Sequence, residues 1–294
     1  KLDLANSIWT DDDKAVIEEE WLKTVKAYFG PDIYSADLPS DGALKAINKW
    51  VNDKTNGMIP KLHDENYDKD TIMVLLNALY MKADWAHKFE GQDTYDREFT
   101  KADGSTVTVP FMNMFEAYES YIKTEDAEGI MLPYDDGRLA FIALKPGSGD
   151  ARGYAASLTG AKLKEAIAAA KADTFVTVNM PKFDTEYSVY LTDALKAMGM
   201  TDAFDPFLAD LSGAGRGIDG PLYISYFFPK VKLVVNVEGP VAAAVTEIAT
   251  AERCALPADE PIVLTFDKPF VYAIVDTETG VPLFMGVMEN PEAK

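Results

Sequence analysis

The chain has 294 residues, of which 48% are hydrophobic and 11% aromatic, and its formal net charge at pH 7 is -20. This length suits one large domain or two average ones, and we expect one. No run of eighteen apolar residues occurs, so the composition predicts a soluble globular protein without a transmembrane span. The negative charge repels phosphate groups, which disfavours nucleic acid and anionic membrane surfaces as partners.

The chain's only cysteine, Cys254, excludes a disulfide and a cysteine-based metal cluster within this chain. The opening stretch KLDLANSIWT, residues 1–10, alternates like a strand, and no secretory signal sequence precedes it. We therefore expect Lys1 to follow a cut rather than to be a natural terminus.

Two helices are predicted next along the chain. Apolar residues recur at helical spacing over residues 14–29, and Gly-Pro-Asp then breaks the pattern. A second helix is expected over residues 41–56, where Asn56-Gly57 ends it. The apolar face of this second helix consists of Leu44, Ile47, Trp50 and Val51.

The middle of the chain is rich in predicted strands. The apolar run at 71–81 is typical of a strand buried on both faces, and residues 105–112 alternate before the stretch 117–123. An alanine-rich helix is expected over 158–171 and a strand over 174–183.

A short helix and two strand systems are predicted after residue 190. Residues 190–200 form the helix, and Gly199 has the usual place of a left-handed cap. Residues 230–239 alternate like a strand, and residues 261–288 predict strands joined by a Thr-Gly turn.

The chain lacks the residue patterns of an enzyme active site or a metal site. Its two histidines, His63 and His87, stand in no metal-ligand spacing. Ser212 has no histidine near it in the sequence, and Cys254 has no evident base partner. The sequence therefore offers no pair of nucleophile and base for nucleophilic catalysis. The stretch GAGRGID misses GxGxxG because Ile218 holds the last glycine position. The sequence therefore predicts neither an enzyme nor a cofactor.

A long segment between the strands that end near Val237 and begin near Pro261 has neither helical periodicity nor compact turn residues. Segments of this length are usually functional or disordered. Its first half, with Ala242–Ala244, has side chains small enough to pack between strands of a sheet. Its second half carries Arg253, and the bond after an exposed arginine is what a trypsin-like protease cleaves. The segment therefore combines a bond that a protease would cleave with a stretch that could become a strand. This combination indicates a device that traps a protease.

Eight stretches of the sequence carry a family resemblance. They are TNGMIPKL (55–62), VLLNALYMKADWAHKF (74–89), VPFMNM (109–114), LPY (132–134), MPKF (180–183), ADLSG (209–213), VEG (237–239) and FDKPFVYAIVDTETGVPLFMGVMENP (266–291). Through these stretches, which stand in the family order, the whole chain resembles the serpin family of serine protease inhibitors, and in particular a bacterial-type member. The resemblance implies an α+β serpin fold with a large central mixed β-sheet, further β-sheets and surrounding helices. It also implies a single serpin domain over 1–294, without the family's N-terminal helices, and an exposed reactive-centre loop at about 238–260.

The resemblance also implies which residues form the functional site. Arg253 and Cys254 would flank the reactive bond. The hinge that enters the sheet would consist of Gly239, Pro240, Ala242, Ala243, Ala244, Val245 and Thr246. The breach and shutter, where the loop enters and where the sheet parts, would involve Trp85, Asn77 and Pro229. Plain core packing is the alternative reading of Trp85 and Asn77.

Three residues depart from the family pattern. Pro240 replaces a usual threonine or serine, and because proline cannot donate a ladder hydrogen bond, it should hinder the first step of insertion. Val237 replaces a glutamate before the hinge. Pro229 replaces a histidine that would bond to the equivalent of Asn77, so we expect an altered shutter.

The resemblance favours a suicide-substrate inhibitor of trypsin-like serine proteases. The target would cut after Arg253 and stay bound as a covalent acyl-enzyme when residues 240–250 insert. We expect a monomer that needs no cofactor and works outside the cell or at the cell surface. One alternative is a non-inhibitory serpin-fold protein that binds or stores a ligand, or is a plain protease substrate. Another is that only a longer form of the chain inhibits.

Overall fold

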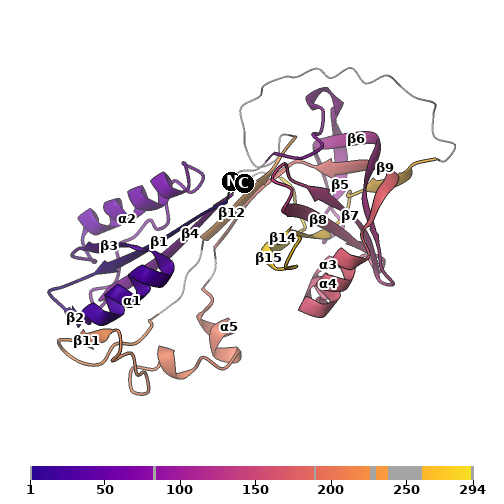
Figure 1. Cartoon of the computed structure of the whole chain (residues 1–294). Helices are drawn as coiled ribbons and strands as arrows, with labels where there is room; N and C mark the ends of the chain where they lie inside the picture. Colours follow the sequence, from indigo (N-terminus) through magenta and orange to yellow (C-terminus); the bar gives the residue numbers. More distant parts are fainter. Residues whose placement is uncertain (1, 82–83, 189, 226–229, 238–259, 293–294) are drawn as a thin grey trace. The chain divides into compact units, whose positions relative to one another are not determined.

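The structure is a computed structural model (Figure 1). It describes residues 2–81, 84–188, 190–225, 230–237 and 260–292. The chain divides into two compact units. The first contains 82–185 and 233–294, and the second contains 2–81 and 186–232.

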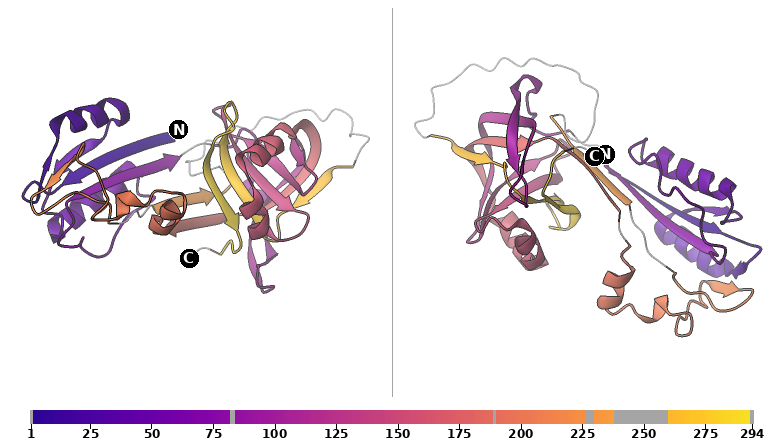
Figure 2. Two further views of the ribbon diagram at one scale, coloured as in Figure 1. Left: turned by 90° about the horizontal axis from the view of Figure 1, so that it is seen from below. Right: turned by 180° about the vertical axis from the view of Figure 1, so that it is seen from behind.

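The first unit is built on an 8-stranded mixed sheet in the order β13-β9-β6-β7-β8-β14-β15, with β5 paired to β6. Its strands are β5 Thr94–Thr100, β6 Thr106–Lys123, β7 Ala127–Pro133, β8 Leu139–Pro146, β9 Lys171–Pro181, β13 Ile262–Thr265, β14 Phe270–Asp276 and β15 Pro282–Met288. The pair β13 and β9 is parallel, and the other pairs are antiparallel. Figure 2 shows the yellow strands β14 and β15 at one side of this sheet. The expected α+β architecture with a large mixed sheet is confirmed.

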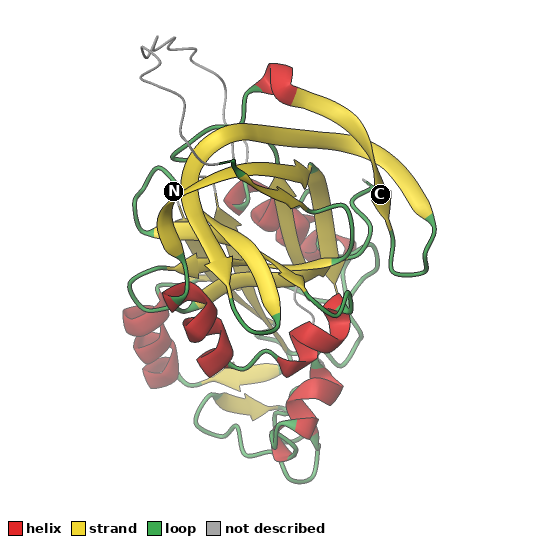
Figure 3. Ribbon diagram, turned by 90° about the vertical axis from the view of Figure 1, so that its right-hand side faces the viewer, coloured by secondary structure: helices red, strands yellow, loops and turns green. Residues whose placement is uncertain are grey.

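Two short helices, α3 Ala151–Ser157 and α4 Gly160–Ala168, lie against this sheet (Figure 3). The side chains of Tyr154 and Leu163 are buried in a cluster with apolar residues of β6, β8 and β14. The expected single helix over 158–171 is wrong at both ends. Thr159 is extended and caps α4 by accepting from Lys162 N at 3.3 Å, and the chain enters β9 at Lys171. Local capping and strand pairing therefore override the alanine-rich pattern.

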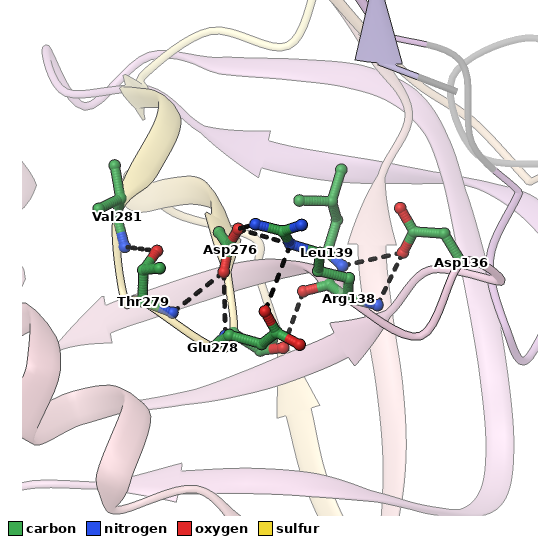
Figure 4. A network of polar contacts seen from close by, with 8 residues as sticks. Asp136, Arg138, Leu139, Asp276, Glu278, Thr279 and Val281 are labelled. Carbon is green, nitrogen blue, oxygen red and sulfur yellow. Dashed lines mark hydrogen bonds and ion pairs between the residues drawn. The ribbon is translucent and has the colours of Figure 1, made fainter.

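The turn between β14 and β15 is held by a polar network (Figure 4). Asp276 Oδ1 accepts from Glu278 N and Thr279 N, each at 3.0 Å. Asp276 Oδ2 pairs with Arg138 Nη2 at 2.6 Å. The backbone donor of Thr279, followed by the Arg138 guanidinium, lowers the pKa of the Asp276 carboxyl. Gly280 has φ 70, which confirms the predicted Thr-Gly turn.

The second unit contains a 3-stranded sheet in the order β3-β1-β4. Its strands are β1 Leu2–Thr10, β3 Asp32–Ser35 and β4 Met73–Met81. Helix α2, Asp41–Lys54, covers one face, where Ile47 and Trp50 pack against Trp9. This confirms the predicted second helix, which Ser40 caps by accepting from Ala43 N at 3.2 Å.

Two expectations for the second unit are wrong. Residues 15–17 are not helical: they form β2, Ala15–Ile17, which pairs with β11, Gly215–Gly217, so helix α1 spans only Glu19–Phe29. Pairing with a distant segment thus overrides the local helical spacing. The strand at 71–81 is not buried on both faces among the described residues, because Leu75 is 59% exposed.

The remaining elements are a further small sheet and short helices. Strands β10, Phe183–Ser188, and β12, Lys230–Val235, form a further 2-stranded sheet. Helix α5, Thr192–Ala197, is followed by Gly199 with φ 102, so the predicted left-handed cap is confirmed. The 3-10 helices are η1 Gly91–Asp93 and η2 Asp202–Phe204.

Candidate functional site: the chain on both sides of residues 238–259

Most of the predicted site residues lie outside the described part of the chain. These are Gly239, Pro240, Ala242, Ala243, Ala244, Val245, Thr246, Arg253, Cys254 and Pro229. The structure does describe the chain that leads into the segment 238–259, which is β12 with Asn236 and Val237, and the chain that leaves it, which is β13. Both flanking stretches, from residue 233 onward, belong to the first compact unit.

Trp85 fixes the chain just before this segment. Its indole Nε1 donates to the backbone oxygen of Asn236 at 2.8 Å, and the side chain is buried. The indole stacks on Tyr134 with ring centroids 4.8 Å apart, and it meets Phe141 edge to face with ring centroids 5.7 Å apart. Trp85 is therefore a core residue that also donates a hydrogen bond to the backbone at Asn236, just before the segment 238–259. Its predicted role in admitting the loop stays a prediction.

The backbone around Trp85 is held by the end of β7. Ala86 N donates to Pro133 O at 3.0 Å, and Asp135 N donates to Asp84 O at 2.9 Å. These two bonds flank the isolated β-bridge between Trp85 and Tyr134. The indole is thus positioned by backbone pairing as well as by ring contacts.

The hydroxyl of Tyr134 is buried without a hydrogen-bond partner among the residues that the structure describes. Its ring forms one wall around Trp85. Burial, with a smaller contribution from Asp136, raises the pKa of Tyr134 above its ordinary value, so the hydroxyl is neutral. A buried hydroxyl without a hydrogen-bond partner lowers the stability of the folded protein.

A histidine and a buried carboxylate meet two residues after Trp85. His87 Nδ1 lies 2.7 Å from Glu119 Oε1 on β6. The carboxyl side chain is only 2% exposed, whereas the histidine side chain is 63% exposed. Burial raises the pKa of Glu119, and the hydrogen bond with His87 opposes this shift.

The chain that leaves the segment is fixed as an edge strand of the 8-stranded sheet. Strand β13 pairs with β9 from Ile262 beside Val176 to Thr265 beside Asn179. Asn179 Nδ2 donates to Thr265 Oγ1 at 3.0 Å, and Asn179 O accepts from Phe266 N at 2.9 Å. The segment 238–259 therefore joins two fixed points of one compact unit.

Asn77 lies on β4 in the second unit. Its Nδ2 donates to Asn6 Oδ1 at 2.8 Å, and Asn6 Nδ2 donates to Phe29 O at 2.9 Å. Within the described chain, β4 has one strand partner, β1, so its other edge has no strand paired to it. The expected role of Asn77 in parting the sheet stays a prediction, and its expected neighbour Pro229 is not described.

Sequence reasoning identified Trp85 but missed the groups that it contacts. The partner in Asn236 is a backbone oxygen, which side-chain identity does not specify. Tyr134 belongs to the LPY stretch that carries part of the family resemblance, and this was the available signal for it. Asn179 and Thr265 come together only through the pairing of β9 with β13.

Comparisons with known proteins agree with this fold. The protein-family model Serpin (serine protease inhibitor) matches residues 1–291. Serpin B10 of Otolemur garnettii is 34% identical over 278 residues, which are 92% of this chain and 69% of that protein.

Two solved structures are similar in fold. The native state of the thermophilic serpin Tengpin has a TM-score of 0.89 at 34% identity, with 99% of this chain and 73% of that one covered. Human thyroxine-binding globulin has a TM-score of 0.85 at 26% identity, with 99% and 75% covered. This chain thus spans about two thirds to three quarters of each relative. The family-model match over nearly all of its residues shows that the chain belongs to the serpin family.

Proposed function

We propose that the chain inhibits serine endopeptidases as a suicide substrate, with a preference for trypsin-like targets. Membership of the serpin family supports a protease inhibitor rather than an enzyme. The observation that carries the proposal is that the chain is fixed on both sides of the segment 238–259. Before the segment, Asn236 accepts a hydrogen bond from Trp85, and after it, β13 pairs with β9. A segment attached at both ends could offer a bait bond without leaving the protein.

The proposed chemistry belongs to the target protease. Its serine attacks the carbonyl carbon of Arg253, the amide bond to Cys254 breaks, and the new amino group leaves with a proton from the protease's histidine. Arg253 is then joined to the protease by an ester. Water would normally hydrolyse this ester, so trapping requires a movement that outpaces hydrolysis.

Strand addition supplies this movement in the proposal. Residues 240–250 follow the end of β12 after residues 236–239, so they could turn back and pair with it in antiparallel fashion. In the described part of the chain β12 pairs only with β10, and its other edge has no strand paired to it. The row Ala242–Ala244 suits such a strand because small side chains need little space. The protease, joined to the carbonyl of Arg253 by the ester, would be carried along and its active site distorted.

We further propose that residues 1–294 act as one serpin domain and as a monomer. Both compact units lie within the family match, which supports their belonging to one domain. None of the helices in the described residues is long and apolar enough to cross a membrane. We propose that the protein acts outside the cell or at the cell surface, as serpins often do.

A second candidate function is that of a non-inhibitory binding or storage protein, or a plain protease substrate. Pro240 supports it because proline lacks the N–H that the first ladder bond of an inserted strand needs. The similarity to thyroxine-binding globulin, solved in complex with its ligand, shows that this fold also occurs in a binding protein. The Ala242–Ala244 row supports inhibition instead.

One experiment separates the two candidates. The protein is incubated with trypsin and run on a denaturing gel, with an Arg253→Glu variant as the matched control. Inhibition predicts a band heavier than either partner for the unchanged protein and none for the variant. A clipped chain without a heavier band would support the plain substrate.

A further inference from the structure

We infer that His87 and Glu119 act as a proton-dependent positioning pair for Trp85. Through Trp85 the pair positions Asn236, from which the chain leads into the segment 238–259. The pair fixes the backbone beside Trp85 while it shares a proton, and it releases this backbone when the pH rises and the proton is lost. The inference rests on the proposed function only where it concerns inhibition, because the link from the pair to Trp85 is measurable without a protease.

The register of β6 turns the side chain of Glu119 away from water. The ladder between β6 and β9 shifts register over residues 114–117, and Phe115 is 52% exposed in this bulge. Beyond the bulge the side chains alternate, so that Tyr118 is 53% exposed whereas Glu119 is buried. His87 Nδ1 lies 2.7 Å from the buried carboxyl oxygen.

His87 is the electrostatic partner of this buried carboxyl. Burial raises the pKa of Glu119, and the hydrogen bond and charge of His87 oppose the shift. Opposite Glu119 on β9 is Thr174, whose hydroxyl donates to Lys171 O at 2.8 Å. The neighbouring stretch of β7, residues 130–133, is uncharged. The proton shared with His87 therefore decides whether this buried place carries a net charge.

The other charged groups around His87 lie on its own segment and on the turn after β7. Lys88 forms an ion pair with Asp84 at 3.6 Å. Glu90 is exposed, and so is Asp135, whose N–H donates to Asp84 O at 2.9 Å. These groups are solvated or paired with one another. The buried carboxyl is thus the group whose environment changes most when His87 gains or loses a proton.

A short segment connects the pair to the start of the proposed inhibitory loop. His87 follows Trp85 by two residues, and between them Ala86 N donates to Pro133 O at 3.0 Å. The indole Nε1 of Trp85 donates to Asn236 O at 2.8 Å. A displacement of His87 therefore shifts the indole relative to the carbonyl that it binds.

The direction of the pH effect follows from the cost of a buried charge. While the pair holds its proton, the carboxyl is either protonated or faces an imidazolium, so the pair is neutral as a whole. When the proton is lost, a carboxylate without a countercharge is left buried, which is strongly unfavourable. The carboxylate then turns toward water and its contact with His87 opens. A rising pH should therefore loosen the bond between Trp85 and Asn236.

The same bond matters for the proposed trapping of a protease. It fixes the place from which residues 240–250 would start to form a strand, and a fixed start lowers the entropy cost of pairing. Trapping should therefore compete best with hydrolysis while the pair keeps its proton. More inhibitor molecules should be consumed per protease molecule as the pH rises.

The first test follows two NMR signals of the whole protein between about pH 5 and pH 9. The chain has two histidines and four tryptophans, so His63→Gln and Trp85→Phe assign the ring signal of His87 and the indole signal of Trp85. We expect both signals to titrate with one common midpoint. His63→Gln is also the matched control and should leave this titration unchanged.

Two variants remove the pair in different ways. Glu119→Gln cannot titrate, so the Trp85 signal should stay constant over the whole range. His87→Ala removes the contact from its exposed side, where the side chain is 63% exposed, and should abolish the Trp85 titration as well. It also keeps the test decisive if the buried substitution prevents folding.

The second test counts the inhibitor molecules consumed per trypsin molecule at each pH. Division by the value for Glu119→Gln removes the pH dependence of trypsin itself. We expect this ratio to rise about threefold from about pH 6 to pH 8, since the loss of one hydrogen bond corresponds to at most about fivefold. His63→Gln should show the same rise as the unchanged protein.

A Trp85 signal that does not respond to pH overturns the inference, and so does one that titrates equally in Glu119→Gln and His87→Ala. A titrating signal together with a constant consumption ratio refutes the part that concerns inhibition. If the unchanged protein forms no complex with trypsin at any pH, the proposed function fails, whereas the NMR titration still decides whether the pair positions Trp85. The two failures are therefore distinguishable.

Discussion

The indole Nε1 of Trp85 donates to the backbone oxygen of Asn236 at 2.8 Å, two residues before the segment 238–259. This bond ties the ring cluster around Trp85 and Tyr134 to the end of the strand from which the proposed inhibitory loop departs. The packing of the core and the backbone at Asn236 are therefore coupled through one side chain.

Replacement of Trp85 by phenylalanine should remove this bond and keep an aromatic ring. We expect the free energy of unfolding to fall by about 1 kcal/mol, because the carbonyl of Asn236 loses its donor. Trp85→Ala should cost about 3–5 kcal/mol because it also leaves a cavity. Thermal melting measures both variants, and equal midpoints for Trp85→Phe and the unchanged protein would contradict the importance of the bond.

Glu119 should make stability depend on pH in an unusual direction. Burial raises its pKa above the ordinary value of 4.5, so the folded state prefers the protonated carboxyl. Its contribution to stability is therefore fully present below pH 4.5 and is lost as the pH rises through the folded-state pKa. Glu119→Gln cannot titrate and can still accept a hydrogen bond from His87.

We expect the Gln variant to gain stability relative to the unchanged protein between pH 4 and pH 7, as measured by urea unfolding at each pH. A stability difference that stays constant over this range would rule out a raised pKa at Glu119.

Asp276 should act in the opposite direction. The N–H of Thr279 and the Arg138 guanidinium lower its pKa below the ordinary value of 3.8 (Figure 4). Its stabilisation is thus present above pH 3.8 and is lost as the pH falls through the folded-state pKa. Asp276→Asn should lower the melting midpoint at pH 7, and the difference should shrink toward pH 2. Arg138→Gln should reproduce part of the loss at pH 7, and a difference that grows in acid would contradict the assignment.

Replacement of Pro240 by threonine should improve inhibition. The new N–H can donate one ladder hydrogen bond to an inserting strand, worth about 1 kcal/mol. This corresponds to a change of about fivefold in the ratio of trapping to hydrolysis. The measured quantity is the number of inhibitor molecules consumed per protease molecule, which should fall toward one. Pro240→Ala serves as the control, since it also restores the N–H, and an unchanged number for both variants would exclude this role.

The sequence predicted elements whose local pattern agrees with their long-range contacts. Helix α2 has an apolar face and a serine cap, and it forms as expected, although it ends at Lys54 rather than at Asn56. Residues 15–17 and the two ends of the helix expected over 158–171 differ from the prediction for the converse reason. In both places the local pattern suits a helix, but the pairing of β2 with β11 and the cap at Thr159 decide the structure.

Sequence similarity could indicate a side chain of the candidate site, but not the contacts that this side chain makes. Trp85 belongs to a long stretch similar to the family, so its place could be expected. The bond to the Asn236 carbonyl and the buried partner of His87 depend on strands distant in sequence, and no local spacing indicates them. The bulge that exposes Phe115 likewise requires the register of β6 against β9.

The central claim is that the protein traps its protease as an ester of Arg253. The most direct measurement is the intact mass of the complex with trypsin, isolated under denaturing conditions. The account predicts one trypsin joined to residues 1–253 with the loss of one water, together with a released fragment 254–294. A preparation that contains only free trypsin and the two fragments would contradict the account.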